Sequence, residues 1–246
     1  MSQKPVWIAS DMHLGAAPPE REEAFYSWLE AAGDSVSHLI LNGDVFDFWF
    51  EYARGRIPSG YDRVLSILKV LTRRGLPVTL MGGNHDWWGG RYLREEIGVE
   101  FLQDPVVREL AGYRAFLAHG DGLGRGDIGY RILRLILRGR LTRWAFAQLG
   151  PTLGGAAARF VSNTTDRWES PGPKERERAG AMEAWARDFM ARRADVDLVV
   201  LGHTHIPLLR RVAPGRWYVN TGDWVWNQSY LELARGRPPR LLHWPE

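Results

Sequence analysis

Five short polar motifs follow apolar runs along this chain, and their side chains are of the types that bind metal ions. They are Asp11-Met12-His13, Gly43-Asp44, Gly83-Asn84-His85-Asp86, His119-Gly120-Asp121 and Gly202-His203-Thr204-His205. Two metal ions about 3.5–4 Å apart need about four ligands each, with one carboxylate shared between them. A mixed set of carboxylates and imidazoles suits Mn, Fe or Zn better than Ca or Mg. The motifs therefore predict a binuclear metal centre of the kind that hydrolyses phosphorus esters.

The first two motifs supply the carboxylates of this predicted centre. Asp11 and His13 are separated by one residue, so at a strand end they point the same way and can bind one metal. Asp44 follows Gly43, which allows close backbone approach, and its carboxylate can bridge two cations. The alternative for Asp44 is a helix N-cap, a common role for aspartate after a strand.

The later motifs supply neutral ligands and a candidate catalytic side chain. Asn84 offers an amide oxygen to a metal, and the adjacent His85 then faces the substrate, as an acid for the leaving oxygen or as a phosphate contact. His119 adds an imidazole, while His203 and His205 diverge from one strand end and suit one metal each. A lone histidine is usually structural, but five ordered motifs on successive strand ends favour a metal site.

The elements that position these motifs predict an α/β fold. Apolar runs that read as buried strands cover residues 6–9, 39–41, 78–81, 115–118 and 198–201. Amphipathic stretches at 20–32 and 61–74 read as helices, and Gly75 and Pro77 end the second. Alternating strands and helices predict a parallel or mixed sheet with ligands at the carboxyl ends of its strands. Short strands at 208–212, 217–220, 229–233 and 240–244 predict a largely antiparallel tail.

The middle of the chain interrupts this pattern with helices. We expect them at 128–138, ended by Gly139, at 141–149, ended by Gly150-Pro151, and at 155–162, before a loop and a long charged helix at 174–193. We interpret residues 125–170 as a helical insertion beside the metal site, within a single domain spanning 1–246. Its first helix carries arginines on one side and apolar residues on the other: Arg131, Arg134 and Arg138 against Ile132, Leu135 and Ile136.

Composition narrows the class of protein. The chain has 246 residues, enough for one sizeable core, and its lack of cysteine excludes disulfides and thiolate metal sites. We expect a cytoplasmic protein, with no signal peptide before the first strand and no membrane-spanning run. Seven Arg and one acid between residues 125 and 159 indicate an anionic partner, such as a phosphorylated substrate or a membrane surface; the alternative is a solvated helix face.

The five motifs resemble the calcineurin-like metallophosphoesterase superfamily, and the resemblance spans residues 7–224. It implies a four-layer α-β-β-α sandwich, here with a helical cap insertion. It also implies a metal-activated hydroxide that attacks phosphorus. By this resemblance one metal is held by Asp11, His13, Asp44 and His205, and the other by Asp44, Asn84, His119 and His203. Asp44, Asn84 and His85 would then be the catalytic residues.

A narrower resemblance rests on two longer runs. Residues 43–49 and 119–123, with 126–130 just after, are similar to the UDP-2,3-diacylglucosamine pyrophosphatases of lipid A synthesis. This implies release of UMP and a diacylglucosamine 1-phosphate at the cytoplasmic face of the inner membrane, with Mn²⁺ as the metal and Fe or Zn as alternatives. The cap would receive the acyl chains; the alternative is that its helices simply pack on the core. Predicted substrate contacts are Asn84, His85, Asp127, Tyr130, Ser162, Asn163 and His203.

One departure keeps other functions open. The best-known branch of that family has Arg where this chain has His85, and the histidine-bearing branch has a less certain substrate. A soluble nucleotide phosphodiesterase or pyrophosphatase is the main alternative, and it predicts a cap too polar or too closed to admit acyl chains. A nuclease is disfavoured because no aromatic and basic single-strand platform is present. A non-enzymatic scaffold predicts missing ligands, whereas all seven are there.

Overall fold

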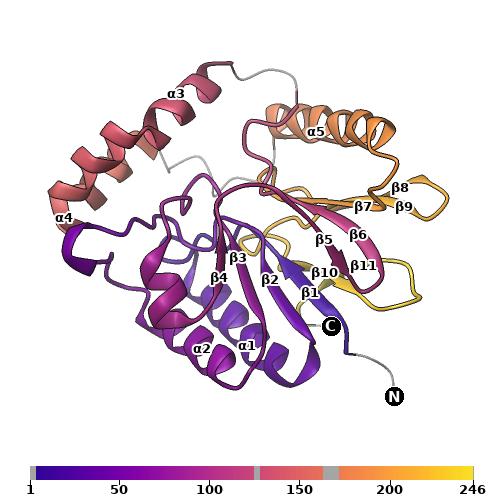
Figure 1. Cartoon of the computed structure of the whole chain (residues 1–246), viewed down its shortest axis with the longest axis horizontal. Helices are drawn as coiled ribbons and strands as arrows, with labels where there is room; N and C mark the ends of the chain where they lie inside the picture. Colours follow the sequence, from indigo (N-terminus) through magenta and orange to yellow (C-terminus); the bar gives the residue numbers. More distant parts are fainter. Residues whose placement is uncertain (1–3, 125–127, 163–171, 246) are drawn as a thin grey trace.

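Two mixed β-sheets pack face to face in the computed structural model (Figure 1), which describes residues 4–124, 128–162 and 172–245. For residues 128–131 and 152–162 only the backbone is described. The first sheet has the order β11 (Arg240–His243), β10 (Ser229–Leu233), β1 (Val6–Ala9), β2 (His38–Leu41), β3 (Val78–Met81) and β4 (Glu100–Leu102). The second has the order β5 (Val106–Leu110), β6 (Tyr113–Leu117), β7 (Leu198–Leu201), β9 (Arg216–Asn220) and β8 (Leu208–Ala213).

Helices cover the outer face of each sheet. The first sheet is covered by α1 (Pro19–Ser35) and α2 (Asp62–Arg73), and the second by α5 (Pro173–Arg192) (Figure 1). Two short helical turns, η1 (Ala53–Gly55) and η2 (Leu93–Ile97), lie in loops of the first half. The result is a four-layer α-β-β-α sandwich, which confirms the predicted fold.

Three separate apolar clusters fill the spaces between the four layers. One lies between the first sheet and its helices, and α2 shows why: Val64, Leu65, Leu68 and Leu71 are buried at helical spacing. A second cluster, which includes Ile8, Ile40, Leu117 and Val200, lies between the two sheets. The third packs α5 on the second sheet. The central strands are buried on both faces, as parallel sheets require, and this fixes the positions of the loops that follow them.

The strand pairing adds two features to the predicted layout. The structure contains β4 and β5, which the sequence analysis did not predict; β4 has only three residues, and β5 lacks a continuous buried run. The tail is largely antiparallel, as predicted, because β8 pairs with β9 and β10 with β11 in this way, but β9 joins β7 in parallel while β10 joins the other sheet antiparallel to β1. Each pair of tail strands therefore completes a different sheet.

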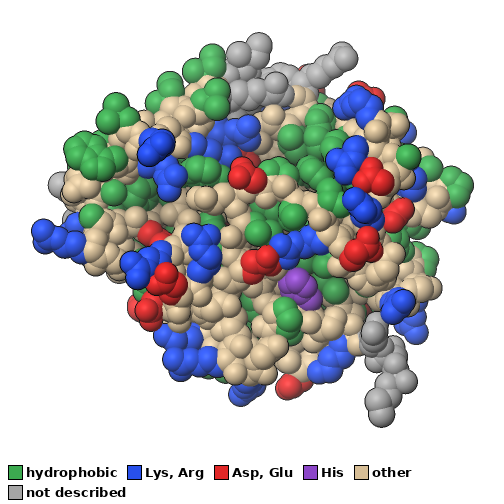
Figure 2. All heavy atoms as spheres, in the orientation of Figure 1, with side chains coloured by type: hydrophobic (Ala, Val, Ile, Leu, Met, Phe, Trp, Pro, Cys, Tyr) green, Lys and Arg blue, Asp and Glu red, His purple; other side chains and the backbone are tan. Residues whose placement is uncertain are grey.

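Two helices stand apart from the layers, and we call them the cap helices. They are α3 (Ile128–Arg138) and α4 (Arg140–Ser162), at the upper left of Figure 1. Helix α3 ends before Gly139, as predicted, and Gly150 interrupts α4 with a non-helical φ of 78°. Hydrophobic side chains gather on the surface over them in the same view (Figure 2). Among the described residues, no helix combines the length and apolar character that crossing a membrane requires.

The layered core gives a direct test of how much its packing contributes. Leu68 of α2 is fully buried, so we expect Leu68→Ala to lower the free energy of unfolding by about 2–5 kcal/mol, from lost burial and the cavity left behind. The matched control is Val70→Ala on the same helix, where the side chain is 47% exposed. Urea denaturation measures both, and equal losses would contradict the assigned burial of α2.

Candidate active site

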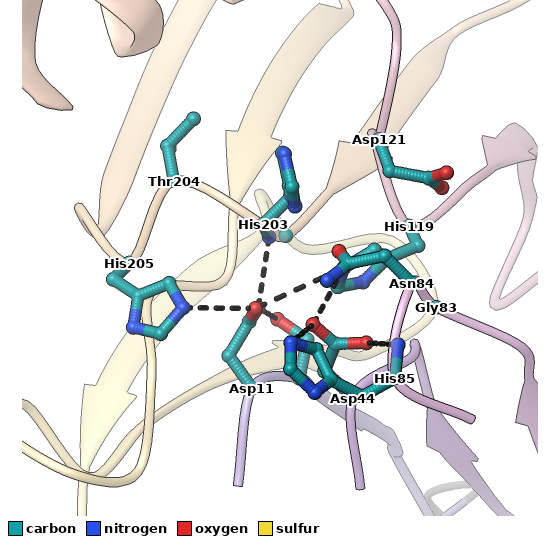
Figure 3. Close-up of polar contacts among 12 residues, drawn as sticks. Asp11, Asp44, Gly83, Asn84, His85, His119, Asp121, His203, Thr204 and His205 are labelled. Carbon is teal, nitrogen blue, oxygen red and sulfur yellow. Dashed lines mark hydrogen bonds and ion pairs between the residues drawn. The ribbon is translucent and has the colours of Figure 1, made fainter. Parts of the chain in front are cut away.

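The seven predicted metal ligands converge where strands of both sheets end. Figure 3 labels all of them except His13, whose ligand atom lies within 4.8 Å of those of Asp11 and Asp44. Asp11 and His13 follow β1, Asp44 follows β2, Asn84 follows β3, His119 follows β6, and His203 and His205 follow β7. The first three strands belong to one sheet and the last two to the other. The site therefore lies at the junction of the two sheets, and each sheet contributes a part of it.

Asp44 lies at the centre of the cluster. Its Oδ2 atom is 3.2 Å from Nε2 of His119, 3.9 Å from Nε2 of His13 and 4.0 Å from Nε2 of His85. Its Oδ1 atom accepts a hydrogen bond of 2.9 Å from the backbone N–H of His85. One carboxylate oxygen is thus fixed by the backbone, while the other faces three imidazoles. This is the placement that a bridging carboxylate needs.

Asp11 divides its two oxygens in the same way. Oδ2 accepts hydrogen bonds from the backbone N–H of His203 at 2.9 Å and from the hydroxyl of Ser10 at 2.5 Å. Oδ1 lies 3.3 Å from Nε2 of His205. Asp11 is fully buried, so its orientation depends on these contacts rather than on water. Both acids therefore present one oriented oxygen to the imidazoles.

Three groups of side chains have ligand atoms within 4.8 Å of one another. They are Asp11 with His13 and His205, Asp44 with His119 and His203, and His13 with Asp44 and His85. The first two groups match most of the two predicted ligand sets, and Oδ1 of Asn84 lies 3.2 Å from Nε2 of His119, beside the second. The assignment of ligands to two metals stays a prediction, but the structure brings all seven residues together.

Three of the five imidazoles are oriented by contacts outside the cluster. Their Nδ1 atoms face the Asn42 carbonyl for His119 at 3.0 Å, the Asp47 carbonyl for His85 at 2.5 Å, and Oδ2 of Asp223 for His205 at 3.3 Å. An acceptor at Nδ1 keeps a proton there and turns Nε2 inward, where it can bind a metal once it carries no proton of its own. Such outer partners are typical of histidines that bind metals.

The donor set fits divalent transition-metal ions. Nε2 of His13 lies 3.4 Å from Nε2 of His205, and two such nitrogens need a proton or a cation between them. Both carboxylates also turn an oxygen toward these nitrogens. Nitrogen and oxygen donors in this mixture favour Mn, Fe or Zn, and the residues that would hold them are the predicted seven.

The histidines of the cluster hold its two carboxylates in the ionised form. Burial would raise the pKa of Asp11, yet nearby His119 and His205 hold it well below its usual range. Burial would also raise the pKa of Asp44, but the nearby His119 and His85 outweigh this effect and hold the pKa well below its usual value. Both carboxylates are therefore ionised at neutral pH, as metal ligands must be.

The histidines divide into two kinds. Burial would lower the pKa of His119, but Asp44 and Asp11 raise it well above its ordinary value, and Asp11 and Asp223 raise the pKa of His205 to about 10. Burial, together with His119, instead lowers the pKa of His203 to about 4. Without metal the site thus holds protons on some of its imidazoles and keeps His203 neutral.

The backbone of the site is held in an uncommon conformation. Five of the predicted ligands have left-handed φ values: Asp11 (59°), His13 (48°), Asp44 (52°), His203 (70°) and His205 (58°). Each such non-glycine residue costs about 1–3 kcal/mol and persists only where the surrounding structure enforces it. Strain of this kind clusters at functional sites, and here it turns the side chains of strand-end loops toward one another.

Two glycines allow the loops to approach so closely. A Cβ atom at Gly43 would lie 2.4 Å from Nδ1 of His119, and one at Gly83 would lie 2.2 Å from Oδ1 of Asp44. Gly43 also has a φ of 96°. These two positions exclude any side chain, and the glycines in the second and third motifs are explained by that contact.

Sequence reasoning assigned no role to several acids that support the site. Asp86 is fully buried and accepts backbone hydrogen bonds of 2.7 Å from both Gly83 and Val45, which ties two ligand loops together. Burial, with Asp44 nearby, raises the pKa of Asp86 to about 7. Asp47 contacts His85, and Asp223 contacts His205, each from outside the cluster. Asp86 lies inside one of the five polar motifs, whereas Asp47 and Asp223 do not.

The predicted substrate contacts have mixed outcomes. Asn84, His85 and His203 lie in the cluster, and His85 is buried against Asp44. Asp127 and Asn163 lie outside the described residues, and for Tyr130 and Ser162 only the helical backbone is described. These last four residues stay predictions.

The geometry defines an α/β sandwich protein with a carboxylate and imidazole centre of metal-binding type where its two sheets meet. The calcineurin-like phosphoesterase family model matches residues 4–207, and the chain belongs to this family. The family is the one expected from the five motifs.

Several relatives within the family share one name. A UDP-2,3-diacylglucosamine hydrolase of Bordetella pertussis is 34% identical over 208 residues, covering 83% of this chain and 78% of the relative. Proteins of the same name from Ralstonia nicotianae (31% identical, 94% of this chain and 90% of the relative) and Porphyromonas gingivalis (28%, 92% of each) are also similar. The likeness extends over most of each protein.

The raised pKa values of His119 and His205 predict that metal binding is linked to proton release. Both imidazoles are protonated at pH 7 without metal and must be neutral as ligands, so Mn²⁺ loading should release about two protons per chain. Affinity should consequently fall as the pH is lowered from 8 to 6. Calorimetry in buffers of different ionisation enthalpy measures the release, and His205→Gln should reduce it. A buffer-independent binding enthalpy would contradict the assigned protonation.

Proposed function

We propose that this protein hydrolyses the pyrophosphate of UDP-2,3-diacylglucosamine to UMP and 2,3-diacylglucosamine 1-phosphate. The observation that carries the proposal is the convergence of Asp11, Asp44 and the surrounding imidazoles in a chain whose relatives bear that activity in their names. When bound, two divalent ions, with Mn²⁺ proposed, polarise the phosphoryl group and activate a water molecule for attack.

The chain's own residues have distinct roles in this reaction. Asp44 stands between the two ligand sets and would be shared by them. Asn84 contributes an amide oxygen beside His119, within reach of a phosphoryl group. His85 is held by the Asp47 carbonyl at Nδ1 and turns Nε2 inward, so it can give a proton to the leaving oxygen or bind phosphate.

The cap helices support a lipid-bearing substrate. In helix α3, Arg134 and Arg138 turn inward and pair with Asp121, while several apolar side chains turn outward. The exposed set on α3 and α4 consists of Ile132 (54%), Leu133 (41%), Leu135 (72%), Ile136 (56%), Leu141 (77%), Trp144 (65%) and Leu149 (44%) (Figure 2). Packing on the core does not account for these side chains. A contiguous exposed apolar surface beside a hydrolytic site favours acyl chains.

The same surface supports contact with a membrane. Arginines accompany the exposed apolar residues, with Arg140 and Arg143 both exposed near Leu141 and Trp144. Apolar side chains flanked by arginines suit the boundary between acyl chains and anionic headgroups. We propose a peripheral association with the cytoplasmic face of the inner membrane, where such a glycolipid would be reached. The alternative, a soluble nucleotide substrate, leaves the apolar cap surface unexplained.

The first experiment compares acylated and unacylated substrates. With Mn²⁺ present, we expect UMP release from UDP-2,3-diacylglucosamine and none from UDP-glucosamine, because only the former reaches both the centre and the cap. Chromatography of UMP measures it, and His119→Ala serves as the control for contaminating activity because it removes an imidazole from Asp44. Cleavage of a generic phosphodiester without turnover of either UDP-sugar would contradict the proposal and indicate a soluble nucleotide substrate instead.

The role of the cap surface is tested by substituting its apolar side chains together. We expect the triple variant Ile132→Ser, Leu135→Ser, Ile136→Ser to lower kcat/KM for the acylated substrate by about 100-fold, which is about 2.7 kcal/mol in total. An acyl chain lying on this surface covers each side chain only in part, so each contributes about 1 kcal/mol rather than the roughly 1.5–3 kcal/mol of full burial. Hydrolysis of bis(p-nitrophenyl) phosphate should change little, because these side chains are largely exposed. Equal loss on both substrates would show that α3 is only structural.

A further inference from the structure

Asp121 makes a contact that the reaction does not require. It lies two residues after His119, is 7% exposed, and in Figure 3 points away from Asp11 and Asp44. Its Oδ2 atom is 2.8 Å from Nη2 of Arg138 and 3.2 Å from Nη1 of Arg134, and its carbonyl accepts a second bond from Arg134 at 2.5 Å. One carboxylate at the rim of the site therefore holds two successive turns of α3.

The same part of α3 also contacts the loop that carries Asn84 and His85. The guanidinium of Arg138 lies 4.7 Å from the centre of the Trp87 ring and 3.5 Å from the carbonyl of Gly83. The indole N–H of Trp88 donates to the carbonyl of Leu137 at 3.3 Å, near the end of the helix. Helix α3 is thus attached to two of the ligand loops, one from each sheet.

We propose that Asp121 is a positioning residue that pairs with Arg134 and Arg138 to hold the cap over the metal centre. These two ion pairs keep Arg134 and Arg138 of α3 against the ligand loops and leave the apolar side chains of the helix facing outward. The substrate class in this inference rests on the proposed function. A substrate that contacts both the metal centre and the cap helices needs these ion pairs, whereas a small phosphodiester needs only the metal centre.

The energetics favour positioning over simple stabilisation. Side chains with exposures of 8% for Asp121 and 20% for Arg138 lose much of their hydration, and the attraction of such a pair roughly offsets that loss. Its directional bonds instead select one arrangement, because any other placement of α3 leaves the carboxylate buried without its partners. An amphipathic helix that turns Arg134 and Arg138 inward and exposes apolar residues needs such a constraint, since hydrophobic packing alone would turn the apolar face inward.

The kinetic test compares the ratio of kcat/KM for UDP-2,3-diacylglucosamine to that for bis(p-nitrophenyl) phosphate. We expect Asp121→Asn and Arg138→Gln each to lower this ratio about tenfold, mainly through KM of the acylated substrate, with Arg138→Lys intermediate. The double variant should lose clearly less than the product of the two single losses, because both variants remove the contact between Asp121 and Arg138. The matched control is Arg91→Gln, which breaks an exposed pair with Glu95 and should leave the ratio unchanged. Multiplicative losses, or an unchanged ratio, would overturn the proposal.

A second measurement needs no substrate and separates this inference from the proposed function. Amide hydrogen exchange over residues 128–138 should be faster in Asp121→Asn than in the wild type or in Arg91→Gln, with metal content unchanged. If the wild type does not cleave the acylated substrate, the proposed function fails while faster exchange still supports the positioning role. Unchanged exchange would overturn that role whatever the substrate.

Discussion

The structure depends on burying two carboxylates, Asp11 and Asp44, side by side at the edge where its sheets meet. Removing one ionised carboxylate from water costs several kcal/mol even after relaxation, and two close together repel as well. The fold meets this cost with imidazoles from both sheets, and metal binding would replace their protons. The left-handed loops, the glycines behind the ligands and the acids behind the histidines all serve that arrangement.

The constraint also explains why the loops have an uncommon backbone conformation while the strands are regular. The strands are buried apolar segments whose pairing needs no unusual residue, and they deliver each loop to a fixed place. The loops then carry the strain, because Asp11, Asp44 and His203 adopt left-handed backbone and Gly43 leaves no room for a side chain against His119. Packing energy in the layers thus offsets conformational cost at the site.

Burial and periodicity are local signals, and they predicted the central strands and the principal helices. The position of the five motifs after strands predicted that their side chains gather, and the resemblance of the motifs to a known family predicted the four-layer fold. The sequence did not predict β4, which has only three residues, or β5, which has only one buried residue. It also did not predict the division of the tail between the sheets, which depends on long-range pairing. It also missed the supporting roles of Asp47 and Asp223, since an acid behind a histidine is defined only by tertiary contact. Periodicity identified the two sides of α3 but not which faces inward, because the ion pairs of Asp121 decide that.

The division of the site between two sheets has a consequence for how the chain matures. The acids and His13 lie within the first 44 residues, whereas His203 and His205 follow β7, about four-fifths of the way along the 246-residue chain. During synthesis the acidic half is therefore complete long before its last counter-charges leave the ribosome. Until β7 pairs with β6, the histidines that follow β7 cannot offset the cost of removing the two carboxylates from water. The junction of the sheets therefore stays open. Closure of the sandwich and neutralisation of its acids are then one event, so an incomplete chain keeps water around the two acids that the finished protein buries.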